Sequence, residues 1–226
     1  MILNIDTSTD ICSVALTDKG TLIAHKEKSG INEHASSLTM LIESMMKEQN
    51  VAMAQLDAVA GSSGPGSYTG LRIGVSTAKG ICYALSLPLI SVPTLHIMAE
   101  ALFEAEPEAQ YALPMLDARR MEVYTQLFAR DRGPINEVEA VIIDTASFSD
   151  LFQNNAVFLC GNGSDKCKEV INGNNVKYTP EINPLAQYMG RLSEEKLKSK
   201  DFEDVTYFEP FYLKEFVATV AKNKIF

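Results

Sequence analysis

Residues Val59–Ile81 read VAGSSGPGSYTGLRIGVSTAKGI, and the rest of the chain is organised around this stretch. A short apolar run ends at Gly61, and Gly64-Pro65-Gly66 then predicts a turn. We expect Ser67 to cap a helix in which apolar residues recur at helical spacing: Leu71, Val75, Ala78, Cys82 and Leu85. A strand, a glycine loop and a helix start aim backbone N–H groups at a ligand or at a neighbouring segment. The sequence alone leaves both interpretations open.

A row of small residues, Gly70, Gly74 and Ala78, recurs every four positions inside that predicted helix. A glycine in a helix interior costs about 1 kcal/mol relative to alanine, so two of them need a packing reason. Small residues on one face allow a second helix to approach closely. We therefore predict a close helix crossing at this row.

The composition restricts the class of protein. The chain has 226 residues, of which 46% are hydrophobic, and a net charge of −9. That charge argues against a protein that binds nucleic acid on its own, because phosphate contacts need a clustered basic face. Met1–Asp6 reaches a carboxylate too early for a signal peptide, and no apolar run approaches the roughly 20 residues of a membrane helix. Four cysteines without CxxC spacing predict reduced core thiols, so we expect a cytoplasmic protein.

The first half predicts a hairpin followed by alternating helices and strands. Strands are expected over 2–8, 12–17 and 21–28, with a turn at Asp18-Lys19-Gly20. Further strands are expected over 57–61 and 87–92, and helices over 32–47, 67–85 and 94–102, the last of them capped by Thr94. The first helix carries an apolar stripe wider than one sheet requires: Ala35, Leu38, Leu41, Ile42, Met45 and Met46. This stripe predicts either deep burial or an edge that meets a second protein.

The second half repeats the first, weakly but in order. Residues 113–119 (LPMLDAR) echo residues 3–8, and Asp131-Arg132-Gly133 stands where Asp18-Lys19-Gly20 stood. Residues 157–163 (VFLCGNG) predict another strand and glycine turn, followed by a helical stretch from Ser164. Two such units in tandem predict a duplicated α/β fold of the actin-like and sugar-kinase-like kind, with a cleft between the units.

We place the domains at 1–106 and 107–226, with the second one reduced. A helix over 184–198 and a C-terminal tail are expected to close the fold. The tail contains four aromatic residues that we interpret as docked side chains and not as a base-stacking platform: Tyr207, Phe208, Phe211 and Tyr212.

Four motifs resemble the bacterial TsaB (YeaZ) family. They are ILNIDTS at 2–8, GPGSYTGLRIGVSTAKGICYAL at 64–85, LDARRMEVY at 116–124 and EPFYLK at 209–214. Together they extend over nearly the whole chain, and the GPGSYTGLRIG block followed by AKG is far more specific than a lone glycine loop. The resemblance implies an actin-like fold (ASKHA, ribonuclease H-like) and a non-catalytic role in forming threonylcarbamoyl-adenosine on tRNA.

The resemblance also implies the partners and the cofactors. The paralogue TsaD would hold a metal ion and perform the transfer, and TsaE would supply ATPase function. This chain alone would bind no cofactor, would meet tRNA only through the complex, and would have no membrane partner.

Catalytic motifs are missing from the chain. A metal site of the kind expected in TsaD needs two histidines close together on a helix and an acid, whereas the histidines here are His25, His34 and His96. Only Glu33-His34 matches half of such a pair, so we expect His34 to lie in a first helical turn near an interface. Neither HExxH nor GxSxG occurs, so the sequence does not support the glycoprotease label that some family members carry.

Nucleotide binding is expected only in degenerate form. ASKHA enzymes hold ATP phosphates between two loops, with an aspartate at the end of the first strand. Asp6, Thr7 and Ser8 stand at the first place, and Asp117-Ala118-Arg119 stands at the second. There Arg119 and Arg120 replace the small residues that would let a phosphate approach the backbone. We therefore expect Asp6 to hydrogen-bond loops at the cleft, or to complete a site that is shared with a partner.

The sequence favours a scaffold subunit that binds TsaD through its first two helices. Together with an equivalent layer of TsaD they would form a four-helix bundle, and the same layer would allow a homodimer. The predicted interface residues are His34, Leu38, Leu41, Met45, Gly70, Leu71, Gly74, Val75 and Ala78. Two alternatives stay open: a free-standing ASKHA-type phosphotransferase or ATPase, and a homodimeric binding module.

Overall fold

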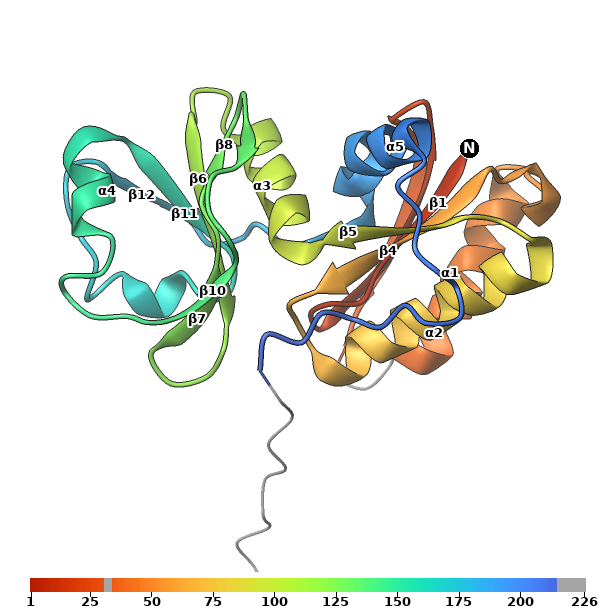
Figure 1. Ribbon diagram of the computed structural model, residues 1–226, viewed down its shortest axis with the longest axis horizontal. Coiled ribbons are helices and arrows are strands. Elements are labelled where there is room, and N and C mark those ends of the chain that lie inside the picture. The colour runs from red at the N-terminus through yellow and green to blue at the C-terminus, as the bar shows by residue number, and fades with distance from the viewer. Residues whose placement is uncertain (31–33, 215–226) are drawn as a thin grey trace, which may run out of the picture.

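The computed structural model describes residues 1–30 and 34–214 (Figure 1). The first half contains β1 (Ile2–Asp6), β2 (Ile11–Asp18), β3 (Thr21–Ser29), α1 (His34–Glu48), β4 (Ala58–Gly64), α2 (Tyr68–Leu85), β5 (Leu89–Pro93) and α3 (Thr94–Ala105). The second half contains β6 (Tyr111–Asp117), β7 (Glu122–Thr125), β8 (Phe128–Ala129), β9 (Gly133–Pro134), β10 (Glu139–Ile142), α4 (Ser149–Asn154), β11 (Val157–Cys160), β12 (Val176–Thr179) and α5 (Gly190–Ser199).

The two halves share one sheet topology. The first sheet has the strand order β3-β2-β1-β4-β5, and the main path of the second sheet is β10-β7-β6-β11-β12. In each sheet the first three strands pair antiparallel and the remaining two are added in parallel. The predicted duplicated α/β fold is therefore confirmed.

Side-chain alternation along the strands gives the first sheet two apolar faces. Leu3 and Ile5 point to the face covered by α1 and α2, whereas Ile2 points to the opposite face. β4 alternates in the same way, with Val59 on the first face and its two alanine neighbours on the second. A parallel strand buried on both faces has few polar residues, which explains the apolar run before the glycine loop.

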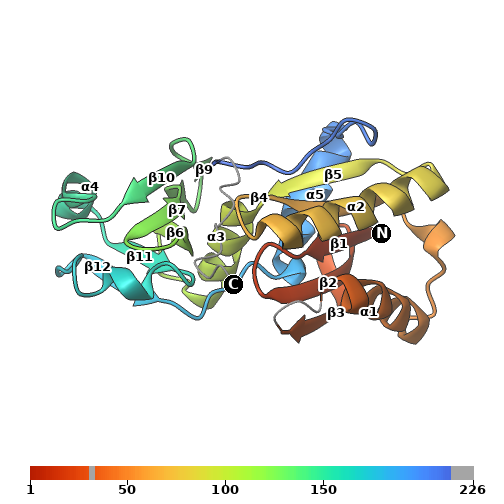
Figure 2. The ribbon, with the colours of Figure 1, turned by 90° about the horizontal axis from the view of Figure 1, so that it is seen from below.

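Helix α3 lies between the two sheets (Figures 1 and 2). Ile97 packs on the first sheet, whereas Leu95, Met98 and Leu102 pack on the second. The prediction that Thr94 caps this helix is wrong, because Pro93 occupies the N-cap position and Thr94 Oγ1 is buried without a hydrogen-bond partner among the described residues.

The second half is smaller than its sequence echo suggests. The helix expected from Ser164 is only a short 3-10 turn, Asp165–Cys167. Asp131 and Arg132 lie in the turn between β8 and β9, and Gly133 begins β9; the two strands form a short hairpin inserted between β7 and β10. The equivalence with the Asp18-Lys19-Gly20 turn is therefore only partial.

Within the described residues, no helix is long and apolar enough to cross a membrane.

The chain returns to the first half after β12. Ala186, Met189 and Leu192, from a 3-10 turn and α5, cover the second face of the first sheet. The tail then runs along α2, where Lys79 Nζ donates to the carbonyls of Thr206 at 3.1 Å and Phe208 at 2.9 Å. Of the four predicted docked aromatics, Phe208 packs on the core. The prediction is wrong for the side chains of Tyr207 and Phe211, which are 81% and 45% exposed. Tyr212 is 36% exposed, and its ring packs against that of Tyr68.

Glycines in α2 allow β1 to approach this helix closely. A Cβ atom at Gly70 or Gly74 would lie closer to Thr7 than any real Cβ lies to a non-bonded atom. Gly80, in contrast, has no atom within 4 Å of such a Cβ. The first two glycines therefore have a packing reason inside the chain, and Gly80 does not.

Gly70→Ala is expected to lower the free energy of unfolding by about 1–3 kcal/mol, because the new methyl group overlaps the carbonyl oxygen of Thr7. Gly80→Ala serves as the matched control and should raise the stability by about 0.5–1 kcal/mol through helix propensity alone. Urea denaturation of both variants measures the difference. Equal stabilities would contradict the assigned packing role of Gly70.

Candidate functional site

The first strand ends in a buried carboxyl group. Asp6 is fully buried and accepts hydrogen bonds from Ser8 Oγ at 2.9 Å and from the Ser8 backbone N–H at 3.2 Å. Burial raises the pKa of Asp6 to about 7, while hydrogen bonds from Ser62 and Ser8 oppose that rise. The side chain therefore ties the end of β1 to β4 inside the protein.

The glycine loop is closed by the chain itself. The backbone N–H of Ser67 donates to Ser8 O at 2.7 Å, and Ser67 Oγ accepts from the N–H of Gly70, which confirms the predicted cap. A Cβ at Gly66 would overlap the carbonyl oxygen of Ser8. At Gly64, with φ +110°, a Cβ would lie 2.5 Å from Phe211 O. The N–H groups at this helix start therefore meet a neighbouring segment, the second of the two interpretations of the sequence.

Asp117, at the end of β6, takes the place that corresponds to Asp6 in the second half. In contrast to Asp6 it is exposed, and it forms an ion pair with Lys166. Its backbone N–H donates to Asn162 Oδ1 at 2.9 Å, and Arg119 N donates to its carboxylate at 3.0 Å. The two loops that hold phosphates in ASKHA enzymes therefore differ here: one is buried and the other is ion-paired.

The two histidines with described side chains lie on different elements. His25 is exposed on β3, whereas His96 lies half-buried on α3 with its ring 5.0 Å from that of Phe128. Burial lowers the pKa of His96. The side chain of His34, at the start of α1, lies outside the described residues. Within the part of the chain that the structure describes, no three His, Cys, Asp or Glu residues are grouped as metal ligands.

The predicted interface residues on α1 and α2 require a correction. Leu38, Met45, Leu71 and Ala78 are fully buried in the core of this chain. Val75 is also buried, Leu41 is half-buried, and Gly70 and Gly74 face Thr7. The small-residue row is therefore filled by the chain's own first loop and does not receive an external helix.

The outward surface of the two helices consists of Leu41, which is in the predicted set, and of residues outside that set. We define the outer face as Met40, Leu41, Ile73, Gly80 and Ala84, of which Met40 is 56% exposed. Ile73, Gly80 and Ala84 follow one another at helical spacing on α2, opposite its buried stripe. The sequence feature that could have indicated this face is Gly80, a helix glycine that does not belong to the row of Gly70, Gly74 and Ala78.

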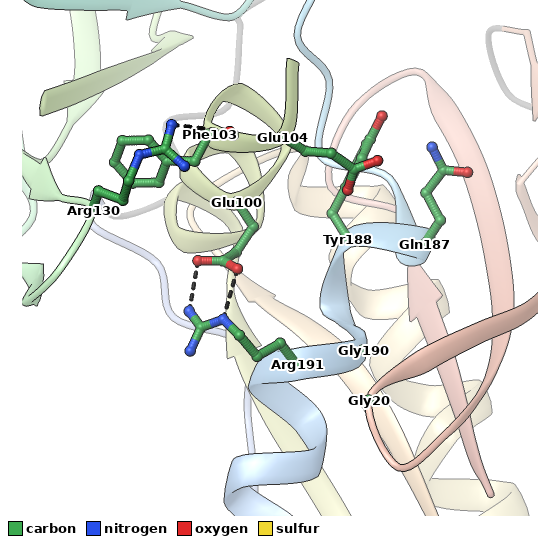
Figure 3. Close-up of a pocket in the computed structure, with 9 residues that line it drawn as sticks. All are labelled: Gly20, Glu100, Phe103, Glu104, Arg130, Gln187, Tyr188, Gly190 and Arg191. Carbon is green, nitrogen blue, oxygen red and sulfur yellow. Dashed lines mark hydrogen bonds and ion pairs between the residues drawn. The ribbon is translucent and has the colours of Figure 1, made fainter. Parts of the chain in front are cut away.

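A cavity of about 280 Å³ lies where α3, α5 and the second half meet (Figure 3). Arg191 of α5 forms a bidentate ion pair with Glu100 of α3, in which Nη2 donates to Oε1 at 2.6 Å and Nε donates to Oε2 at 2.8 Å. Arg130 lies over the ring of Phe103 at 4.7 Å and donates to carbonyl oxygens at the end of α3. These arginines hold α3 from both sides, and none of the lining residues belongs to the Asp6 loop.

Comparison with known proteins identifies the family. A model of the TsaD family, described as tRNA N6-adenosine threonylcarbamoyltransferase, matches residues 21–222. The tRNA threonylcarbamoyladenosine biosynthesis protein TsaB of Haemophilus influenzae is 30% identical over 231 residues, which cover 94% of this chain and 93% of that protein. The chain belongs to the TsaB family.

Solved structures support the same assignment. YeaZ from Pseudomonas aeruginosa, with 25% identity, superposes with a TM-score of 0.83 over 94% of this chain and 99% of that chain. The activator of the 2-hydroxyisocaproyl-CoA dehydratase from Clostridium difficile, solved with bound ADPNP, gives a TM-score of 0.50 over 90% of this chain and 98% of that chain. At 9% identity this second likeness shows the fold alone. The actin-like fold predicted for this TsaB family member is confirmed.

The buried carboxyl group predicts a specific pH dependence of stability. Because the pKa of Asp6 rises from 3.8 to about 7 on folding, the native protein retains a proton that the unfolded chain releases. The stability from this group is complete below about pH 4 and is lost as the pH rises to about 7. The stability of Asp6→Asn should therefore rise relative to wild type across this window, by up to a few kcal/mol, and the difference should then stay level.

Urea denaturation at a series of pH values from about 4 to 8 measures this difference. Asp131→Asn is the matched control, because the side chain of Asp131 is 73% exposed. A stability difference between Asp6→Asn and wild type that does not change with pH would contradict the assigned burial of a neutral Asp6.

Proposed function

We propose that this chain is a non-catalytic subunit for the threonylcarbamoyladenosine modification of tRNA, in which it binds and supports a catalytic TsaD subunit. One observation carries the proposal: the Asp6 loop is packed against Gly66, Gly70 and Gly74 of its own chain. A loop that is filled in this way leaves no room for a phosphate beside its backbone N–H groups.

The electrostatics of the two loops support the same conclusion. An aspartate that orients Mg²⁺ must be ionised and accessible, whereas Asp6 is fully buried with its pKa raised to about 7. The carboxylate of Asp117 is engaged by Lys166. We infer that ATP and the metal ion are held by the partner subunits, with TsaE supplying the ATPase function.

The outer face of α1 and α2 supports binding to a partner. Gly80 costs helix stability and relieves no contact within the described chain, so an external helix gives it a packing reason. Met40 exposes an apolar side chain on the neighbouring helix α1, and methionine adapts to different packing partners.

The family relationship supports TsaD as that partner. The TsaD model matches most of this chain, so TsaD offers a related pair of helices to the outer face. Two related layers pack as a pseudo-symmetric four-helix bundle, and a second copy of this chain would form a homodimer by the same contact.

Gly80→Arg is expected to abolish binding to TsaD while the monomer remains folded, because the arginine side chain fills the space that a crossing helix would occupy. The homodimer should dissociate as well. A pull-down with TsaD and size-exclusion chromatography report binding, and circular dichroism reports the fold.

Ile142→Arg on β10 is the matched control, because Ile142 is 73% exposed and lies on the second half of the chain. It should bind TsaD as the wild type does. If Gly80→Arg retains wild-type affinity, the partner surface lies elsewhere. If the purified wild-type chain alone hydrolyses ATP with Mg²⁺, the alternative of a free-standing ATPase replaces the proposal.

A further inference from the structure

The turn between β6 and β7 carries two adjacent arginines in an unusual conformation. Arg119 has φ +72° and Arg120 has φ +50°, a backbone region that side chains other than Asn, Asp and Gly rarely adopt. Asparagine or glycine would satisfy this turn without strain. The left-handed conformation of both residues fixes the geometry of the turn that presents the two side chains.

The guanidinium groups of these arginines are available for a ligand. Both residues are exposed, and neither guanidinium forms a hydrogen bond or an ion pair with another described residue. The nearby carboxylates are already neutralised, since Asp117 pairs with Lys166 and Glu122 pairs with Lys214. The tip of the turn therefore carries two uncompensated positive charges.

The C-terminal tail extends this basic surface to the first half. Lys214 joins the end of the tail to Glu122, two residues from Arg120. Two residues before Lys214, the ring of Tyr212 lies 4.8 Å from that of Tyr68, and Arg72 lies 5.3 Å from the Tyr68 ring. Glu209 in the tail places a negative charge near Tyr212, opposite in sign to that of Arg72.

This surface combines the two features that single-stranded RNA requires. Arginines in a fixed turn bind phosphate oxygens with paired N–H groups, and exposed tyrosine rings stack on bases. Tyr212 is 36% exposed, with its ring packed against that of Tyr68. We call the set Arg72, Tyr212, Arg119 and Arg120 the basic edge; the Lys214–Glu122 ion pair joins its two parts.

We propose that the basic edge binds the phosphate backbone of an RNA strand, with Tyr212 stacking on a base. The choice of RNA as the source of the phosphates rests on the proposed function in tRNA modification. A contact confined to one edge agrees with the net charge of −9, because such a protein contributes local contacts to a complex and does not bind RNA over its whole surface.

The double variant Arg119→Asn/Arg120→Gly tests the proposal, because it removes both charges and relieves the backbone of the turn. Its melting temperature should not fall. Its affinity for a fluorescently labelled tRNA transcript, measured by anisotropy at about 50 mM salt, should fall by about tenfold, and the salt dependence of binding should become shallower by about 1–2 units of slope.

Two control variants distinguish charge from structure. Arg119→Lys/Arg120→Lys should retain most of the affinity, because lysine also attracts phosphate. Arg132→Asn, at a side chain that is 77% exposed on the β8–β9 turn, should bind RNA as the wild type does.

Tyr212→Leu tests the stacking contact. It should weaken binding of a single-stranded RNA while leaving the salt slope unchanged.

Three outcomes would overturn the proposal. They are equal RNA affinity of the wild type and the Asn/Gly variant, no RNA binding by the wild type at low salt, and displacement of the RNA by ATP, which would assign the arginines to a nucleotide. The pull-down with TsaD is a separate readout, and the Asn/Gly variant should still form that complex. A failed pull-down by wild type therefore contradicts the proposed function, whereas a failed RNA assay contradicts the basic edge.

Discussion

The hydrogen bond from Thr7 Oγ1 to the carbonyl oxygen of Gly70, 2.8 Å long, fixes the end of β1 against α2. The Thr7 backbone can come this near only where the helix has no side chains, which explains Gly70 and Gly74. The same approach brings Ser8 against Gly66 and buries Asp6. The Asp6 loop is therefore a packing element in this chain, and this packing is the physical basis of the proposed non-catalytic role.

Much of the fold was predictable because burial imposes a period on the sequence. Strands such as β1 and β4 alternate between two apolar faces, and Ser67 marks the start of α2 with a capping oxygen. The reduced second half was harder to predict, because the turn at Asp165–Cys167 retains the strand and glycine signals of a longer unit without its helix. The shared position of α3 was not predictable, since an all-round apolar helix does not indicate which sheet each side faces.

The candidate site shows where periodicity stops being informative. Small and apolar residues at helical spacing indicate that something packs closely on a helix, but not whether the neighbour is the same chain or another protein. The row at Gly70 and Gly74 is filled by Thr7, which lies 63 positions before Gly70, so only a three-dimensional structure could assign it. Gly80, which lies outside the row, has no atom of the described chain near its Cβ position, and the proposed external contact rests on it. The backbone conformation of Arg119 and Arg120 has no signature in composition or spacing, although the residues themselves were noticed.

The late return of the chain has a consequence for its synthesis. The second face of the first sheet, with Ile2, Ala60 and Ile90, is covered by Met189 and Leu192 from the C-terminal part. A ribosome adds about 5–20 residues per second, so for several seconds after α3 has emerged this apolar face has only Ile97 to cover it. During that interval the nascent first half can collapse around α1 and α2 but cannot complete its core. Transiently exposed apolar surface of this kind is prone to aggregation until α5 has left the ribosome.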